Sequence, residues 1–157
     1  DIGQIADLSR IHKIQLNAST ITDEFLKALK NLDANFNNIS ALHNYYPHVY
    51  TGLDNYYFSD QNKILHDFGL TVGAFVSSRD GVRRPPLGEG LTTLEMCRNY
   101  STDLSARYLA AMGSDFIIIG DGQPTESELK AVAEVRNDEV ILHARLVTVD
   151  PVSIELL

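Results

Sequence analysis

The stretch "SDFIIIGD" (residues 114–121) contains four consecutive apolar residues and ends in a glycine and a carboxylate. A short unbroken apolar run that is rich in β-branched residues is typical of a strand buried on both faces of a parallel sheet. Asp121 would then stand at the carboxyl end of this strand. A charge there is costly unless it has a partner or a function. The stretch therefore predicts a buried parallel strand and a candidate site residue.

The rest of the chain repeats this order of strand, polar loop and helix. We expect strands near residues 13–18, 37–43, 70–77 and 115–120, and a further strand over residues 139–149. Helices are expected over residues 22–32, 53–69 and 92–113, and after a capping box formed by Thr125 and Glu128. The third helix would start at a similar capping box, Thr92 and Glu95. Strands that alternate with helices indicate a parallel sheet covered by helices.

A polar cluster follows each strand, and these clusters distinguish between two parallel folds. The size of the chain alone favours a flavodoxin-like, doubly wound sheet. Polar residues at the carboxyl ends of successive strands are instead how barrel enzymes build an active site. We therefore expect an α/β fold of the TIM-barrel type, with four consecutive βα units, or half of a (β/α)8 barrel, plus one further strand. The pattern changes near Asn137, so residues 1–137 form the predicted half-barrel and residues 138–157 a separate extra strand.

Composition excludes several classes of function. The chain has 157 residues and a formal net charge of -8, which argues against a nucleic-acid or anionic-membrane surface. No apolar run is long enough to span a membrane. One cysteine, Cys97, allows no internal disulfide framework. The five histidines are scattered, and neither a dinucleotide fingerprint nor a Walker loop occurs, so we expect no metal site and no cofactor.

The third loop, "SSRDGVRRPPLGEGLTTLE" (residues 77–95), is unusually rich in charged residues. Guanidinium groups such as those of Arg83 and Arg84 recognise phosphate and carboxylate oxygens. Glu89 lies between two glycines and has no evident structural duty, whereas Glu95 is better explained as a capping residue. The alternative is a solvated loop with stray charges.

The second loop, "HNYYPHVYTGLD" (residues 43–54), combines aromatic and hydrogen-bonding side chains. His43 ends its strand and is expected to point over the edge of the sheet, and the alternative is a core histidine satisfied by the backbone. Tyr46 and its neighbours could serve packing alone. Aromatic rings beside donors and acceptors also suit a sugar, whose apolar faces stack while its hydroxyls form hydrogen bonds.

The segments "KIQLNAST", "HNYYPHVYTGL", "GLTVGAFVSS", "RRPPLGEGLTTLE" and "FIIIGD" resemble successive motifs of the bacterial 6-phospho-N-acetylmuramidases. That family was long catalogued as outer-surface-protein-like proteins of unknown function. The resemblance extends in register from about Ile5 to Val149. It implies that the chain is the second half of a TIM barrel, followed by a smaller cyclophilin-like domain. It also implies a cytoplasmic glycosidase that cleaves 6-phospho-N-acetylmuramyl disaccharides during the recycling of cell-wall peptidoglycan.

The resemblance also implies roles for single residues. Glycoside hydrolysis usually requires two carboxyl groups, and Asp121 and Glu89 are the catalytic candidates. Arg84, helped by Arg83, would hold the phosphate or the lactyl carboxylate. The remaining sugar ligands would be Asn17, His43, Asn44 and Tyr46.

Three positions depart from the family pattern. His48 stands where the family usually has arginine, Pro85-Pro86 where it has Gly-Pro, and Cys97 where a histidine is common. These differences could alter the ligand without altering the fold.

Two other classes of function stay open. The chain could be a non-catalytic carbohydrate- or phosphosugar-binding barrel fragment. It could also belong to a barrel enzyme of another chemistry, such as an aldolase, although no lysine at a strand's carboxyl end is available for a Schiff base. In each case we expect the missing half of the barrel or a partner in a homo-oligomer to cover the open face. The isolated fragment should be inactive.

Overall fold

A computed structural model describes residues 1–136, 138, 139, 141 and 147. Its four strands form one parallel sheet in the order β1-β2-β3-β4. All four predicted strands are confirmed to within two residues. The predicted strand over residues 139–149, like the segment 138–157 as a whole, falls almost entirely outside the described residues. The strands are β1 (Ile14–Asn17), β2 (Ile39–Leu42), β3 (Thr71–Val76) and β4 (Phe116–Ile119).

Five α-helices occur in the described part of the chain, and side chains cap most of their first turns. Thr22 and Asp54 accept main-chain N–H groups at the starts of α2 and α3. The predicted capping box of Thr125 and Glu128 is confirmed at the start of α5. The first helix, α1, was not predicted, and the side chain of Asp1 caps it. The helices are α1 (Ile2–Ile11), α2 (Asp23–Asn31), α3 (Asn55–Asp67), α4 (Thr102–Ala111) and α5 (Glu126–Ala133), with 3-10 turns η1 (Phe36–Asn38) and η2 (Glu95–Cys97).

The prediction of a helix over residues 92–113 was wrong in its first half. Thr93 is bound to the edge of β3 instead, because its N–H donates to the carbonyl of Phe75 and its hydroxyl accepts the N–H of Phe75, both at 2.9 Å. These bonds hold the backbone extended, so the second capping box does not form. The helix α4 begins only at Thr102.

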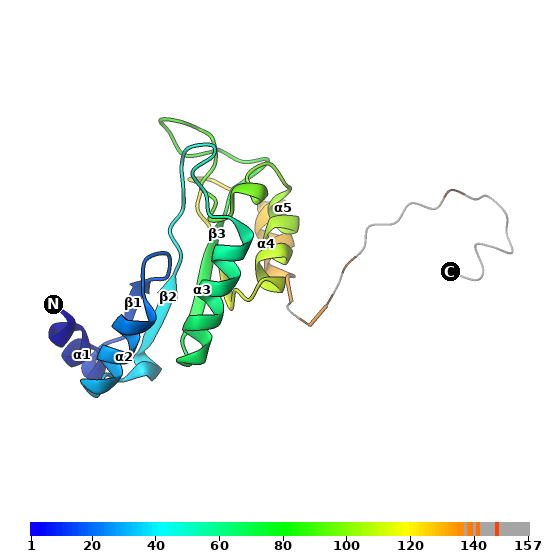
Figure 1. Cartoon of the computed structure of the whole chain (residues 1–157). Helices are drawn as coiled ribbons and strands as arrows, with labels where there is room; N and C mark the ends of the chain where they lie inside the picture. Colours follow the sequence, from blue (N-terminus) through cyan, green and yellow to red (C-terminus); the bar gives the residue numbers. More distant parts are fainter. Residues whose placement is uncertain (137, 140, 142–146, 148–157) are drawn as a thin grey trace, which may run out of the picture.

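The order of the strands determines where the helices lie. Each connection joins neighbouring strands and steps in the same direction across the sheet. Because such crossovers are right-handed, α2, α3 and α4 are placed on one face; Figure 1 shows α3 in front of β3 and α4 beside α3. A doubly wound sheet reverses its strand order at a switch point. This sheet has no such reversal within the described residues.

The hydrophobic core lies between the sheet and these helices. Val72, Ala74 and Val76 alternate along β3 and are fully buried against the helices. Leu65 and Phe58 of α3 pack against these residues from the helix layer and are also fully buried. Burying each such large side chain contributes about 1.5–3 kcal/mol to folding, so this layer supplies much of the stability of the domain.

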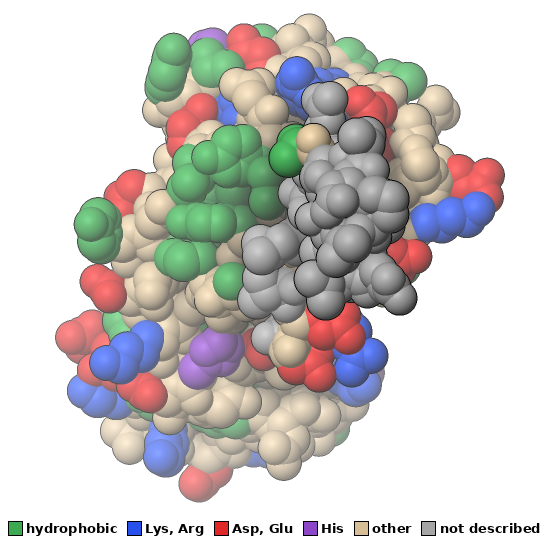
Figure 2. All heavy atoms as spheres, turned by 90° about the vertical axis from the view of Figure 1, so that its right-hand side faces the viewer, with side chains coloured by type: hydrophobic (Ala, Val, Ile, Leu, Met, Phe, Trp, Pro, Cys, Tyr) green, Lys and Arg blue, Asp and Glu red, His purple; other side chains and the backbone are tan. Residues whose placement is uncertain are grey.

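The opposite face of the sheet carries the alternate residues and remains partly exposed. Phe75 and Phe116 are only half-buried, and Ile118 is 36% exposed. The ring of Phe116 lies over Gly73, where an added Cβ would stand 2.1 Å from a ring carbon. Hydrophobic side chains also gather on the side of the molecule where α4 and α5 lie (Figure 2). The exposure of Phe75, Phe116 and Ile118 shows that the described helices leave an apolar sheet face open.

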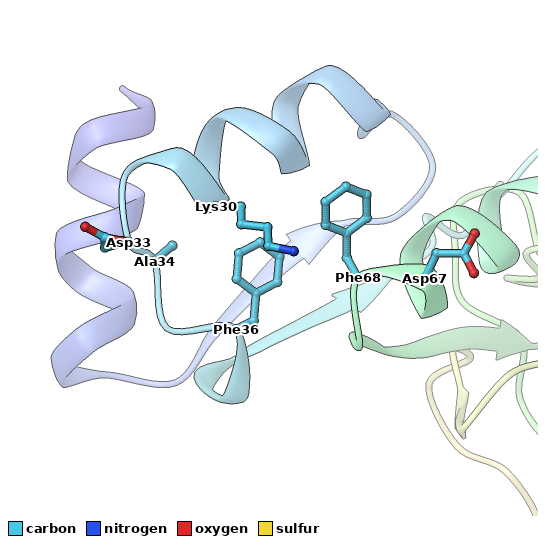
Figure 3. A pocket seen from close by; sticks show the side chains of 6 residues that line it. All are labelled: Lys30, Asp33, Ala34, Phe36, Asp67 and Phe68. Atoms are coloured by element: carbon cyan, nitrogen blue, oxygen red, sulfur yellow. The ribbon is translucent and has the colours of Figure 1, made fainter.

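A hollow of about 430 Å³ lies at the amino-terminal edge of the sheet. The rings of Phe36 and Phe68 stack across it with their centroids 6.1 Å apart, while Lys30 and Asp67 line its rim (Figure 3). These residues precede β2 and β3 or end α2 and α3. The hollow is thus at the opposite end of the strands from the polar clusters that the sequence singled out.

Candidate functional site

The candidate site is built from three loops at the carboxyl ends of the strands. The loop after β2 (residues 43–54) pairs with the loop after β3 (residues 77–94) through bridges between Tyr46 and Thr92 and between Leu53 and Leu94. A third bridge, between Val82 and Gln123, joins the loop after β3 to the loop after β4. The three loops therefore form one continuous layer above this edge of the sheet.

Asp121 anchors the loop after β3. Its side chain is buried, and its Oδ2 accepts the N–H groups of Ser78 at 2.9 Å and Leu91 at 3.4 Å. Its Oδ1 accepts the N–H of Arg84 at 3.0 Å. The carboxylate thus binds the start, middle and end of the loop, and it has the partners that a buried charge requires.

Glu128 is a second buried anchor, although its sequence pattern predicts only a helix cap. Its carboxylate accepts hydrogen bonds from the hydroxyls of Ser78 and Thr102 and from the main-chain N–H groups of Arg79 and Thr125. Burial alone would raise the pKa of Glu128, but these hydrogen bonds lower it well below its ordinary value. Glu128 is therefore ionised and holds the loop after β3 to the start of α5.

Arg98 and Glu95 form an ion pair that was not predicted from the sequence. The guanidinium of Arg98 is buried, with Nε 2.7 Å from Oε1 and Nη2 2.6 Å from Oε2 of Glu95. Its Nη1 donates to the carbonyls of Tyr46 and Gly90, and Glu95 accepts the N–H of Gly52. The hydrogen bond from Arg98 lowers the pKa of Glu95 to about 2, although burial opposes it. The spacing Glu-x-x-Arg was the available signal, and the pair ties the loops after β2 and β3 together.

The prediction that His43 points over the edge of the sheet was wrong. Residues 39, 41 and 43 share the helix-facing side because side chains alternate along a strand, so the imidazole is fully buried. Its Nε2 lies 2.8 Å from Oδ1 of Asn62, whose amide donates to the carbonyl of Met112. Its Nδ1 faces the hydroxyl of Ser19 at 3.2 Å. Burial lowers the pKa of His43 to about 4, so the ring is neutral.

Asn44 instead lies at the surface, and the buried histidine helps to place it. The N–H of Asn44 donates to the Ser19 hydroxyl at 2.9 Å, and its carbonyl accepts the hydroxyl of Thr93. Asn17 is also exposed and accepts the N–H of Ser19 at 3.0 Å. Two of the predicted sugar ligands are thus joined through one serine. Tyr46 is half-buried, and its main chain is bound to Thr92 and Arg98.

Glu89 lies where the two longest loops meet. Its Oε2 is 2.6 Å from Nδ1 of His48 and accepts the N–H of Val49 at 2.7 Å. The hydrogen bond from His48, followed by that from Val49, lowers the pKa of Glu89. With 29% of its side chain exposed, Glu89 is an ionised carboxylate within reach of a ligand.

The two arginines that follow β3 are used differently. Arg83 donates to the main-chain carbonyls of Ser78, Glu89 and Arg98 and so holds the loop in shape. The guanidinium of Arg84 is exposed and makes no hydrogen bond to another described residue. It lines a hollow of about 360 Å³ together with Tyr45, Pro47, Pro85, Pro86, Leu87 and Leu91.

The arrangement offers carboxylate, amide and guanidinium chemistry. No group of three or more His, Cys, Asp or Glu within the described ranges is placed to hold a metal ion. None of the helices in those ranges is long and apolar enough to cross a membrane.

Comparison with known proteins identifies relatives of this chain. A family model described as "6-phospho-N-acetylmuramidase, N-terminal" matches residues 1–134. A conserved Enterococcus faecalis protein of unknown function has a similar crystal structure, with a TM-score of 0.74 and 38% identity, covering 82% of this chain and 36% of that one. An uncharacterized B. cereus protein is also similar, with a TM-score of 0.78 and 29% identity, covering 87% of this chain and 41% of that one. The chain thus spans less than half the length of these proteins. No curated protein matches it.

Proposed function

Because the chain belongs to the 6-phospho-N-acetylmuramidase N-terminal family, we propose that it is part of a glycosidase that cleaves 6-phospho-N-acetylmuramyl disaccharides. The match over residues 1–134 is the observation that carries this proposal. Recycling of peptidoglycan in the cytoplasm, which the sequence resemblance implies, belongs to the same proposal. The exposed groups at the carboxyl edge of the sheet support it with chemistry suited to a charged amino sugar.

We further propose that the described residues are half of a TIM barrel. Three observations support this: the sequential strand order, the placement of the helices on one face, and the apolar face that remains open. The fraction of the solved relatives that the chain covers, 36% and 41%, leaves enough length for the other half. The additional strands would close against Phe75, Phe116 and Ile118. A second copy of the chain is the alternative cover for this face.

The catalytic step in this proposal uses two carboxyl groups around the glycosidic bond. Glu89 is ionised and partly exposed, which suits a general base or a nucleophile rather than the acid. Asp121 is the other candidate in this chain, although its two oxygens already hold the loop that carries Glu89. The acid could also come from the other half of the barrel.

The substrate would be held by groups with free hydrogen-bonding capacity. Asn17 and Asn44 are exposed and offer amides to sugar hydroxyls or to the acetamido group, and Tyr46 offers an aromatic surface beside them. Arg84 offers a cation to an anionic group of the substrate. Arg83 and His43 act indirectly in this scheme. Arg83 shapes the loop, and His43 fixes the serine that positions both asparagines.

The direct test is turnover by the full-length protein. We expect hydrolysis of a 6-phospho-N-acetylmuramyl glycoside, and a loss of about a hundredfold or more in kcat for Glu89→Gln if Glu89 transfers a proton or attacks the sugar. Glu126→Gln is the matched control, because Glu126 is an exposed glutamate on α5 with 81% of its side chain in solvent. Absence of turnover on this substrate, or full activity of Glu89→Gln, would contradict the proposal.

A further inference from the structure

The hollow beside Arg84 has an unusual lining for a site at the edge of a barrel. Pro47, Pro86, Leu87 and Leu91 make most of its wall apolar, and Arg84 is the one charged residue in that wall. Tyr45 closes one side and is itself held by an edge-to-face contact with Phe75, with ring centroids 5.3 Å apart. The hollow therefore offers one guanidinium and several apolar surfaces.

The lining of the hollow offers too few free donors and cations to bind a phosphate dianion well. Phosphate sites generally use several main-chain N–H groups or several cations. The N–H groups of Ser78, Arg84 and Leu91 already donate to Asp121. The neighbouring Arg83 has its guanidinium on main-chain carbonyls, and Arg98 is bound to Glu95. Asp121 also places a negative carboxylate next to the main chain of Arg84, which disfavours the binding of a doubly charged phosphate there.

A carboxylate on a short apolar group fits the same lining. One carboxylate carries a single charge and matches the planar guanidinium in a bidentate contact. A methyl group beside it can be buried against Pro86, Leu87 or Leu91, and removing this apolar surface from water favours binding. N-acetylmuramic acid differs from N-acetylglucosamine by such a group, a lactyl ether.

We propose that this hollow is the lactyl subsite and that Arg84 selects muramyl over glucosaminyl sugars. The inference rests on the proposed function, since that function supplies the sugar. The lactyl carboxylate binds Arg84, and its methyl group lies against the apolar wall. The 6-phosphate is bound by other groups. Arg84 is then a specificity-determining residue.

Kinetics of the full-length protein test the role of Arg84. Two substrates with the same aglycone would be compared, a 6-phospho-N-acetylmuramyl and a 6-phospho-N-acetylglucosaminyl glycoside. We expect Arg84→Gln to lower kcat/KM about ten- to a hundredfold for the muramyl substrate, mainly through KM, and to leave the glucosaminyl substrate within about twofold. Arg79→Gln is the matched control, because Arg79 is an exposed arginine of the same loop that does not line the hollow. Equal losses on both substrates would overturn the subsite.

Binding of unphosphorylated sugars separates the subsite from the reaction. We expect ligand-detected NMR to show that free N-acetylmuramic acid binds more tightly than N-acetylglucosamine and that Arg84→Gln removes the difference. If that holds while no glycoside is hydrolysed, the proposed function fails and the subsite stands. If hydrolysis occurs without discrimination by Arg84, the subsite fails and the function stands. Absence of both results overturns both. An unchanged melting temperature for Arg84→Gln would establish that the variant is folded.

Discussion

Nδ1 of His48 lies 2.6 Å from Oε2 of Glu89, and the N–H of Val49 donates to the same oxygen at 2.7 Å. The two loops that follow β2 and β3 thus meet at one carboxylate oxygen, and this contact lowers the pKa of Glu89. The charge of a proposed catalytic group is therefore stabilised by hydrogen bonds from the neighbouring loop.

Replacing His48 should change the pH dependence of activity. The hydrogen bond from His48 is the largest cause that lowers the pKa of Glu89, with smaller effects from Val49 and Arg98. A reaction that needs ionised Glu89 loses rate when the pH falls through that pKa. In His48→Gln the pKa should rise toward its ordinary value, so the acidic limb of the kcat/KM profile should move to higher pH.

The matched control for His48 is His66→Gln. His66 pairs with Asp115 at 2.9 Å in the same kind of contact, but at the amino-terminal edge of the sheet. We expect its pH profile to match that of the parent protein. An unmoved limb in His48→Gln, or the same shift in both variants, would remove the assigned role of Glu89.

Asp121→Asn should loosen the loop after β3. The amide has one acceptor oxygen instead of two and would place an N–H₂ group against a main-chain N–H that donates to Asp121. Leaving such a buried donor unsatisfied costs about 1–3 kcal/mol. We expect a lower urea midpoint and faster tryptic cleavage between Arg83 and Arg84. Asp60→Asn, an exposed change on α3, is the control.

The variant Asp121→Asn also tests whether Asp121 holds the loop after β3 or takes part in the reaction, when kcat and tryptic cleavage are measured together. If kcat falls while the loop stays protected from trypsin, Asp121 acts on the reaction directly. If activity and protection are lost together, its duty is to hold the loop. Unchanged stability with unchanged kcat would contradict both roles.

The buried His43 should make the protein less stable in mild acid. Its pKa is about 4 in the folded state and 6.5 ordinarily, so the unfolded chain binds a proton between these values and the folded chain does not. The contribution of neutral His43 is complete above pH 6.5 and is lost as the pH falls toward 4. The difference corresponds to about 3 kcal/mol.

Denaturant unfolding at several pH values would measure this effect. The free energy of unfolding of His43→Gln should change less between pH 6.5 and 4 than that of the parent protein. His12→Gln, at an exposed histidine, should keep the parental slope. An identical slope in His43→Gln would show that the imidazole is not held neutral.

Breaking the pair of Glu95 and Arg98 should destabilise the two loops together. Glu95→Gln leaves the buried guanidinium of Arg98 without its counter-charge, a change that costs about 3 kcal/mol in a mostly buried site. The double variant with Arg98→Met should recover part of this loss, because no unpaired charge remains. Thermal unfolding of the three variants would measure the coupling. Additive effects would show that the two residues act independently.

Local patterns in the amino-acid sequence predict the order and position of most regular elements. The four strands, the helices α2 and α3, and the capping box of Thr125 and Glu128 depend on neighbours a few residues apart. Period-two and period-3.6 patterns and cap residues carry that local information. The family resemblance, which rests on whole motifs, also came from the sequence, and the family model confirms it.

The positions of the polar side chains depend instead on contacts between segments that are distant in the sequence. Alternation turned His43 into the core and Asn44 outward, and a shift of one residue along a strand reverses such an assignment. Thr92 and Glu95 have the spacing of a capping box, but the contact between Thr93 and Phe75 prevented the helix. Ser78 is bound by both Asp121, which is 43 residues away in the sequence, and Glu128, which is 50 residues away. Arg83 and Arg84 are the same residue type, and only their surroundings give them different roles. A polar side chain has several possible partners of similar energy, and folding selects among them by bringing distant segments together.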